Sequence, residues 1–342
     1  MESSKRGRIL RMLDGERTGE IFCSCNLTTV TWDTMDAIGV YWPEAHMDPE
    51  LMVKLGESQY TLLGFESVRS GFDVGTEAQA LGAEVNMGGR SSNVYVTKPA
   101  FDDPDSFAVP QNLFKLGRFP VHFKALNILR DKYRDKVPIY ALFMGPMTLL
   151  GGLFKIESIM RWSRKEPTLF RGLLEKVSDI TANYGNLLIE NGADALSMGD
   201  PIASGNLISP KVFKEFLIPI YRKLSEEIKG RVILHICGDT NQILDLISET
   251  GFCGFSFEGP VVPVKKVKEI IGDRMALFGD IPTVNVLMNG TVDDVKSAVI
   301  KAIEGGVDSV APACAFPLQT PIANQRTIAE TVRQYNKSKG FD

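Results

Sequence analysis

Apolar and polar positions follow a regular order along most of the chain, in which short apolar runs are separated by longer segments with helical spacing. The apolar runs predict strands at residues 21–25, 137–143, 193–199, 231–237, 254–258, 275–280 and 308–314. The segments between them place apolar side chains at the spacing of helices that bury one face. They predict helices at residues 5–14, 48–64, 74–82, 118–134, 149–191, 209–228, 240–249, 262–271, 291–304 and 321–337.

This order predicts an α/β protein in which helices cover a parallel sheet. About eight such units in one chain favour closure into a (β/α)8 TIM barrel, here with N-terminal additions. A doubly wound open sheet is the alternative, but no glycine-rich dinucleotide fingerprint follows the first predicted strand. We therefore expect a single (β/α) barrel domain over residues 1–342.

One stretch departs from the repeating pattern. Residues 86–117 contain glycines, prolines and the acidic run DDPD, and they show neither helical nor strand periodicity. We expect this segment to be an excursion from the barrel that shapes the mouth of the site.

Composition narrows the class of protein. A hydrophobic fraction of 44%, a charged fraction of 23% and a net charge of −4 are typical of a globular protein with a large core. Lysine and arginine are spread along the chain without a basic stripe, which argues against nucleic-acid binding. No apolar stretch has the length of a signal peptide or of a membrane helix, so we expect a cytoplasmic protein without membrane contact.

The chain contains five cysteines, an odd number that fits reduced thiols better than a disulfide framework. Cys23 and Cys25 alternate onto one side of a predicted strand and form a rival metal pair, but no histidine is near them in sequence. Buried cysteine commonly acts as a small apolar residue, so we favour a structural role for this pair and for Cys253.

A stronger metal candidate lies in the segment HICG, at the end of a predicted strand. Side chains two positions apart on a strand face the same side, so His235 and Cys237 can share one ion. Cys314 ends the last predicted strand, and the C-terminal ends of barrel strands gather on the face that holds active sites. One histidine and two thiolates are a typical ligand set of catalytic zinc. A buried histidine and two unrelated core cysteines are the alternative, which this pattern alone leaves open.

Glu258 ends the strand between these ligands and is the candidate for a fourth, exchangeable position. Two thiolates already neutralise a zinc dication, and a third anionic ligand makes the ion a weak Lewis acid. Such an ion can still hold a substrate thiol as its anion at neutral pH, because coordination deprotonates the thiol. A displaceable carboxylate therefore predicts thiol activation.

Other polar residues follow predicted strands. Asp200 belongs on the same rim as the metal candidates, where we expect it to orient substrate. The turn Gly145–Thr148 is read as a strand-to-helix connection. Asp73 and Glu77 lie one helical turn apart, and they either face a pocket together or act as charges at a helix N-terminus.

Several motifs also resemble those of a known family. The segments HICGDT, APAC, GDPIASGNLISP, YWPEAH and FDVGTEAQALGAEV are similar to the methylcobamide:coenzyme M methyltransferases, and the similarity runs over nearly the whole chain. These belong to the uroporphyrinogen decarboxylase superfamily of (β/α) barrels. The resemblance implies a cytoplasmic enzyme of methanogenic methyl metabolism. It implies that zinc assists methyl transfer to coenzyme M, or another small thiol, from the methylcobamide of a partner corrinoid protein.

The resemblance also implies residue roles. His235, Cys237 and Cys314 fall on the family's zinc-ligand positions, and Glu258 falls on the carboxylate that can complete the shell. Three alternatives stay open: a corrinoid-methylating O-, N- or S-demethylase of the same superfamily, a uroporphyrinogen decarboxylase-like protein, and a non-catalytic corrinoid-binding protein. The arginine-rich N-terminal signature of the decarboxylases is missing here, and the HICG motif with one late cysteine favours the thiol-methylating branch.

Overall fold

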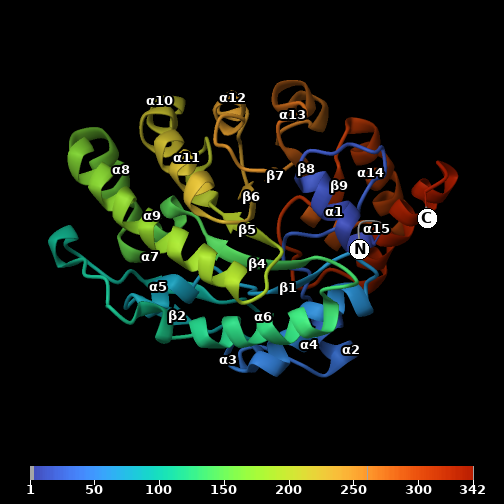
Figure 1. Cartoon of the computed structure of the whole chain (residues 1–342), viewed down its shortest axis with the longest axis horizontal. Coiled ribbons are helices and arrows are strands. Elements are labelled where there is room, and N and C mark those ends of the chain that lie inside the picture. The colour runs from blue at the N-terminus through green and yellow to red at the C-terminus, as the bar shows by residue number, and fades with distance from the viewer. Residues whose placement is uncertain (1–3, 260, 342) are drawn as a thin grey trace.

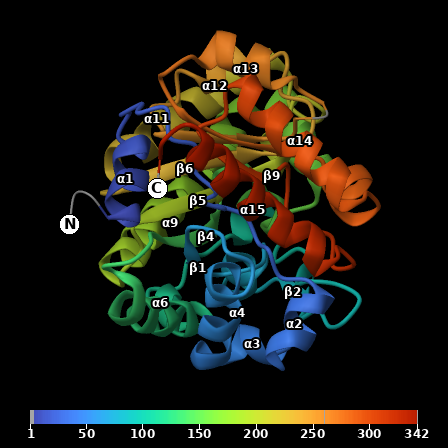
Figure 2. The same ribbon diagram turned by 90° about the vertical axis from the view of Figure 1, so that its right-hand side faces the viewer.

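The computed structural model describes residues 4–259 and 261–341, and its centre is a curled parallel sheet. The strands are β1 (Val68–Ser70), β4 (Ile139–Met144), β5 (Ala195–Gly199), β6 (Arg231–Ile236), β7 (Gly254–Phe257), β8 (Ala276–Ile281) and β9 (Ser309–Pro312), and they neighbour one another in that order. Helices surround these strands in both views of the ribbon (Figures 1 and 2).

An extended segment near the N-terminus closes the gap between the first and last strands of the sheet. Phe22 forms a parallel bridge with Ser309 of β9, and the backbone N–H of Val310 donates to the Phe22 carbonyl at 2.8 Å. On the other side, the N–H of Glu66 donates to the Cys23 carbonyl at 2.8 Å. The segment thus takes the place of an eighth strand, and the prediction of a (β/α) barrel is confirmed. The strand predicted at 21–25 is reduced to one bridge.

The helices follow the predicted order. They are α1 (Lys5–Leu13), α2 (Trp32–Ile38), α3 (Glu44–Met47), α4 (Pro49–Thr61), α5 (Thr76–Ala80), α6 (Phe119–Tyr133), α7 (Pro146–Leu153), α8 (Ile156–Lys165), α9 (Pro167–Glu190), α10 (Pro210–Val212), α11 (Ile218–Glu227), α12 (Leu244–Ile247), α13 (Val264–Ile271), α14 (Val292–Gly305) and α15 (Ile322–Ser338). The helix predicted at 209–228 is divided by a π-helical turn, η4 (Phe213–Leu217), just before Pro219, which lacks an N–H for regular helical bonding. A second π-helical turn, η5 (Thr283–Met288), follows β8.

The N-terminal addition covers one end of the barrel. Apolar residues of α1, among them Ile9 and Met12, are buried against Phe22, Tyr140 and Ile233 from the first half of the strands. The Arg6 guanidinium forms an ion pair with Asp194, which directly precedes β5. Since α1 packs on the N-terminal ends of the strands, access to the barrel interior is left to the opposite, C-terminal face.

The segment 86–117 contains little regular structure. It includes β3 (Tyr95–Lys98), paired antiparallel with β2 (Glu84–Asn86), and two short 3-10 turns, η1 (Pro104–Ser106) and η2 (Leu113–Lys115). Phe101 and Phe107 pack against Phe154, with ring centroids 5.7 and 6.0 Å away from it. The excursion is thereby anchored to the end of α7.

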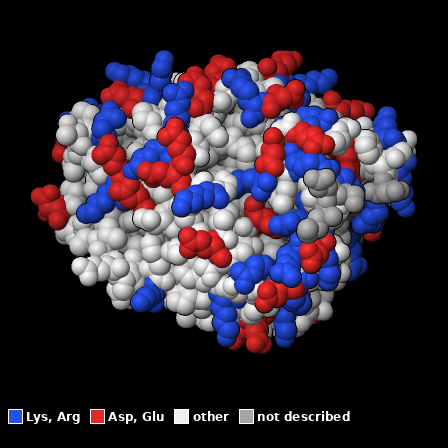
Figure 3. Space-filling model, viewed as in Figure 1, with Lys and Arg blue, Asp and Glu red and all other residues white. Residues whose placement is uncertain are grey.

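The surface carries charges of both signs. Acidic and basic side chains are intermixed on the face shown in Figure 3. None of the helices in the described part of the chain combines the length and the apolar character needed to cross a bilayer.

Candidate metal centre

Three predicted ligands converge at the C-terminal face of the barrel. His235 lies on β6, Cys237 directly follows that strand, and Cys314 is two residues beyond β9. One ligand atom from each residue lies within 4.8 Å of the other two. Within residues 4–259 and 261–341, this is the one group of three or more histidine, cysteine or acidic side chains that lie so close together. The structure therefore brings together a set that is separated by 77 positions in sequence.

The histidine is oriented for a ligand. His235 is 5% exposed, and its Nδ1 shares a hydrogen bond with Ser256 Oγ at 3.1 Å. Its Nε2 is buried without a hydrogen-bond partner. Metal-bound histidines commonly use one ring nitrogen for the metal and the other for a hydrogen bond that fixes the ring. A buried nitrogen without a partner is costly, and a metal ion would offset that cost.

The two thiols form a coupled pair. Their shared hydrogen bond raises the pKa of Cys237, the donor, and lowers the pKa of Cys314, the acceptor. His235 also lowers the pKa of Cys314. A thiolate beside a second sulfur and an imidazole nitrogen is a soft donor set of the kind that zinc prefers.

Glu258 lies beside the three ligands but outside their group. Its Oε2 accepts a hydrogen bond of 2.7 Å from the backbone N–H of Gly238, in the turn after Cys237. The negative charge of Glu258 contributes to the raised pKa of Cys237, which shows that the two side chains are near each other. The carboxylate is thus held at the edge of the site by one backbone hydrogen bond. Its role as fourth ligand stays a prediction.

Asp200 is fully buried and caps a helix. Its two oxygens accept hydrogen bonds from the backbone N–H groups of Met147 and Thr148, from Thr148 Oγ1, and from Tyr221 Oη at 2.8 Å. A Cβ added at Gly145 would lie about 2.5 Å from this carboxylate, so only glycine admits the contact. Burial raises the pKa of Asp200 to about 6, although each of these hydrogen bonds acts to lower it. These contacts favour a structural role, and the catalytic role expected for Asp200 stays a prediction.

A cavity of about 270 Å³ opens onto the three predicted metal ligands. Its walls are mostly apolar and come from five strand ends, the excursion and the segment after Phe22: Leu27, Thr28, Phe72, Asp73, Val74, Asn93, Val94, Leu142, Met144, Gly199, Pro201, His235, Cys237, Cys314 and Ala315. Asn93 and Val94 belong to segment 86–117, so the excursion contributes to the cavity wall as the sequence predicts.

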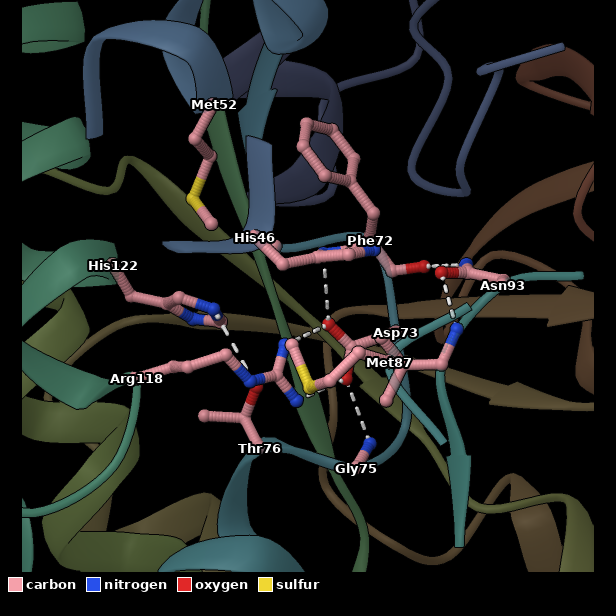
Figure 4. A network of polar contacts seen from close by, with 12 residues as sticks. His46, Met52, Phe72, Asp73, Gly75, Thr76, Met87, Asn93, Arg118 and His122 are labelled. Carbon is pink, nitrogen blue, oxygen red and sulfur yellow. Dashed lines mark hydrogen bonds and ion pairs between the residues drawn. The ribbon is translucent and has the colours of Figure 1, made fainter. Parts of the chain in front are cut away.

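A buried ionic network lies behind one wall of this cavity (Figure 4). The Arg118 guanidinium donates two hydrogen bonds, of 2.6 and 2.9 Å, to the Asp73 carboxylate. His46 Nδ1 lies 3.4 Å from the same carboxylate. Burial alone would raise the pKa of Asp73, but the charge and hydrogen bonds of Arg118 outweigh it and hold that pKa well below its ordinary value. Asp73 is therefore ionised and internally neutralised.

Glu77 is also buried, but its environment has the opposite effect. One oxygen accepts a 2.7 Å hydrogen bond from the N–H of Met144, a residue of the cavity wall. Burial nevertheless raises the pKa of Glu77 to about 7, and the nearby Asp73 charge adds to the effect. Asp73 and Glu77 therefore do not face the cavity together. Asp73 lines it, while Glu77 holds the end of β4 through its hydrogen bond with Met144.

The remaining cysteines lie outside the metal group. Cys23 and Cys25 are buried, and Cys25 Sγ contacts the Leu27 carbonyl at 3.3 Å. Cys253 Sγ contacts the Val232 carbonyl at 3.2 Å. Burial raises the pKa of all three thiols, so each stays protonated at neutral pH. Their contacts agree with the structural role expected for them.

Three polar residues near the cavity had no signal in the sequence. Thr28 and Asn93 line it from stretches without motif or clear periodicity, and Arg118, at the start of the helix predicted at 118–134, neutralises Asp73. Only the pairing seen in three dimensions identifies them.

Comparison with known proteins places these features in context. A family model described as uroporphyrinogen decarboxylase (URO-D) matches residues 4–335. The chain is 36% identical over 336 residues to methylcobamide:CoM methyltransferase MtaA of Methanosarcina barkeri (strain Fusaro), with 98% of this chain and 99% of that protein covered. It is 32% identical to a methylated-thiol–coenzyme M methyltransferase of Methanosarcina mazei, with 97% and 90% covered.

Solved structures show the same relationship. A methyltransferase from Methanosarcina mazei matches with a TM-score of 0.94 and 34% identity, covering 97% of this chain and 99% of that one. A B12-independent methionine synthase from Shewanella sp. W3-18-1 matches with a TM-score of 0.63 and 15% identity over 93% of this chain and 99% of its own. At that identity, the second likeness concerns the fold alone.

The raised pKa of Glu77 predicts a specific pH dependence of stability. In the unfolded chain this carboxyl has a pKa near 4.5, against about 7 in the folded protein. The folded state therefore holds the proton more tightly, and the contribution of Glu77 to stability is present below pH 4.5 and is lost as the pH rises through 7. The difference amounts to at most about 3 kcal/mol.

We expect Glu77→Gln, which keeps the acceptor for Met144 without ionising, to remove this loss. The free energy of unfolding, measured by urea denaturation at pH 5 and pH 8, should fall more in the unsubstituted protein than in the variant. Exposed Glu226 provides the control substitution, Glu226→Gln. Parallel pH profiles for all three proteins would show that Glu77 is ionised in the folded state.

Proposed function

Because the chain belongs to the uroporphyrinogen decarboxylase family, and within it to the methylcobamide:coenzyme M methyltransferases, we propose that it transfers a methyl group from a methylated corrinoid protein to the thiol of coenzyme M, with zinc held by His235, Cys237 and Cys314. The observation that carries this proposal is the convergence of one imidazole and two sulfurs within 4.8 Å at the mouth of a barrel.

The residues present fit a zinc ion. His235 offers a buried Nε2 with no other partner, and one sulfur from each cysteine lies close enough to it to share one ion. Three protein ligands, from the ends of β6 and β9, leave a coordination position for an incoming group, whereas structural zinc usually has four fixed protein ligands. Bound zinc would hold the substrate thiol as a thiolate at neutral pH, which keeps its sulfur nucleophilic.

The chain itself positions the reactants. Ser256 orients the His235 ring, and the backbone N–H of Gly238 holds the Glu258 carboxylate beside the site, where it would be the candidate to complete the zinc shell. In the transfer, one S–C bond forms and one Co–C bond breaks. The thiol loses its proton to solvent, and the electron pair of the Co–C bond stays on cobalt. The apolar cavity wall excludes water from this alignment, which favours a direct displacement.

The rim around the cavity supports docking of a corrinoid protein. Large apolar side chains are exposed on segments that follow the strand ends or belong to the hairpin beside them: Val74, Tyr95, Leu207, Val261 and Val284. Exposed apolar side chains on the loops that surround an active-site mouth offer surface that a protein partner can cover. We infer that the corrinoid partner binds over this rim and presents its methyl group to the cavity.

A second candidate donor follows from one relative. The Methanosarcina mazei protein that is 32% identical is named for a methylated thiol as methyl source. This keeps the S-demethylating alternative open for this chain. One assay separates the two activities, which is methylation of the corrinoid by methanethiol or dimethyl sulfide. An S-demethylase carries out this transfer, whereas the proposed enzyme needs a corrinoid that is already methylated.

The zinc proposal predicts the effect of removing one ligand. In Cys314→Ser, we expect the zinc affinity and the rate of methyl transfer from free methylcobalamin to coenzyme M to fall at least ~100-fold, because even indirect metal partners contribute 10- to 100-fold. Cys253→Ser, which also changes a cysteine near a strand but keeps a donor to Val232, should retain both. Full zinc binding by Cys314→Ser would refute the ligand set.

If the corrinoid protein binds over this rim, a rim substitution should affect methyl transfer from the corrinoid protein but not from free methylcobalamin. Val284→Lys introduces a charge at a side chain that is 48% exposed, so it should weaken docking of the corrinoid protein without altering the reaction with free methylcobalamin. Tyr60→Lys is the control, since Tyr60 is near the end of α4 that leads to the N-terminal end of β1. We expect the KM for the methylated corrinoid protein to rise roughly tenfold in the rim variant alone. An unchanged KM would place the docking surface elsewhere.

A further inference from the structure

Arg69 is a charged residue inside the barrel that the metal site does not explain. Residues of β1 alternate, and Ser70 faces outward, where its Oγ contacts Met52 of α4 at 3.4 Å. Arg69 therefore faces inward, in register with Tyr140 of β4. Its side chain is 1% exposed. Burying a guanidinium is costly unless an opposite charge accompanies it.

The structure provides no such charge. Arg69 Nε donates to the Gly71 carbonyl at 3.1 Å, and Nη1 donates to the Asn26 carbonyl at 3.3 Å. Nη2 is buried without a partner. Among the residues that the structure describes, no carboxylate lies within 4.0 Å of this guanidinium. Burial lowers the pKa of Arg69 to about 10, so the group stays charged at neutral pH.

The other buried guanidinium in this region has a different environment. Arg118 is also 1% exposed, but the Asp73 carboxylate neutralises it through two hydrogen bonds. Within the barrel, Arg118 is thus paired with a carboxylate of the same chain, whereas Arg69 contacts backbone carbonyls only. This contrast indicates that the counter-charge of Arg69 comes from a ligand.

The unpaired guanidinium lies directly behind residues that line the cavity. The bond to Gly71 places the guanidinium next to a residue whose neighbours, Phe72 and Leu142, line that cavity. Thr28, which also lines it, has a buried Oγ1 without a partner. Thr28 is two positions from Asn26, whose carbonyl accepts the Arg69 bond. The Thr28 hydroxyl and the predicted metal ligands therefore border one cavity, with the Arg69 guanidinium next to its wall.

We propose that Arg69, assisted by Thr28, binds the acidic end of the thiol substrate, a sulfonate, while the substrate sulfur reaches His235, Cys237 and Cys314. This inference rests on the proposed function for the identity of the thiol. The N–H groups of a guanidinium form strong, directed hydrogen bonds to the oxygens of an oxyanion, and the negative charge offsets the buried positive one. A two-carbon thiol with an anionic end thereby binds in one orientation, with its sulfur toward the metal.

The test compares two thiols that differ only at the far end, 2-mercaptoethanesulfonate and neutral 2-mercaptoethanol. Binding of each to the zinc-loaded protein is measured by calorimetry. We expect Arg69→Met to weaken binding of the sulfonate thiol roughly 10- to 100-fold and to leave 2-mercaptoethanol unchanged. Arg231→Met removes an arginine from the opposite end of β6 and should change neither. An equal loss for both thiols, or for neither, would overturn the proposal.

A second measurement separates this inference from the proposed function. Ethanesulfonate lacks a thiol, so its binding to the metal-free protein, followed by ligand-observed NMR, reports on the anion site alone. Binding that Arg69→Met abolishes supports the site even if no methyl transfer is found. No binding, or equal displacement by inorganic sulfate, contradicts a site built for the substrate. Should Arg69→Met not fold, Arg69→Lys serves instead, with a partial loss expected for the sulfonate thiol only.

Discussion

The function proposed for this protein depends on the curvature of its parallel sheet. β6 and β9 are separated by two strands, so in a flat sheet the ligands at their ends could not share an ion. Closure through the segment around Phe22 turns the inner faces of these strands toward one another. Bonds between neighbouring strand ends then fix the ligands: His235 to Ser256, Gly238 to Glu258, and the N–H of Ala313 to the Ile281 carbonyl.

The barrel interior combines this rigid frame with an unusual distribution of charge. Asp73, which lines the cavity, and Arg118 beside it neutralise each other, so their contribution is to hold the loop after β1 in place. Arg69 has no equivalent partner within the described chain. A buried positive charge without a partner lowers the stability of the free protein. It favours anionic ligands over neutral ones, because only an anion can neutralise it.

Much of the fold was readable from the sequence because apolar runs mark the buried strands from β4 to β9. β1 was missed, since its three residues, Val68–Ser70, include a charged side chain and give no apolar run. The short helices α2 and α3 were also missed. The grouping of His235, Cys237 and Cys314 could be predicted because the first two alternate on one strand and parallel strand ends meet at one face. Glu258 and Asp200 were placed on the correct rim, but their hydrogen-bond partners depend on backbone groups that no motif reveals.

The central claim is that zinc held by one imidazole and two thiolates has a position open to the substrate sulfur. X-ray absorption at the zinc edge, on protein with and without coenzyme M, tests this most directly. The account predicts a shell with two sulfurs and lighter nitrogen or oxygen atoms in the free protein, and one additional sulfur once the thiol is present. A sulfur count that does not change on adding coenzyme M would contradict it.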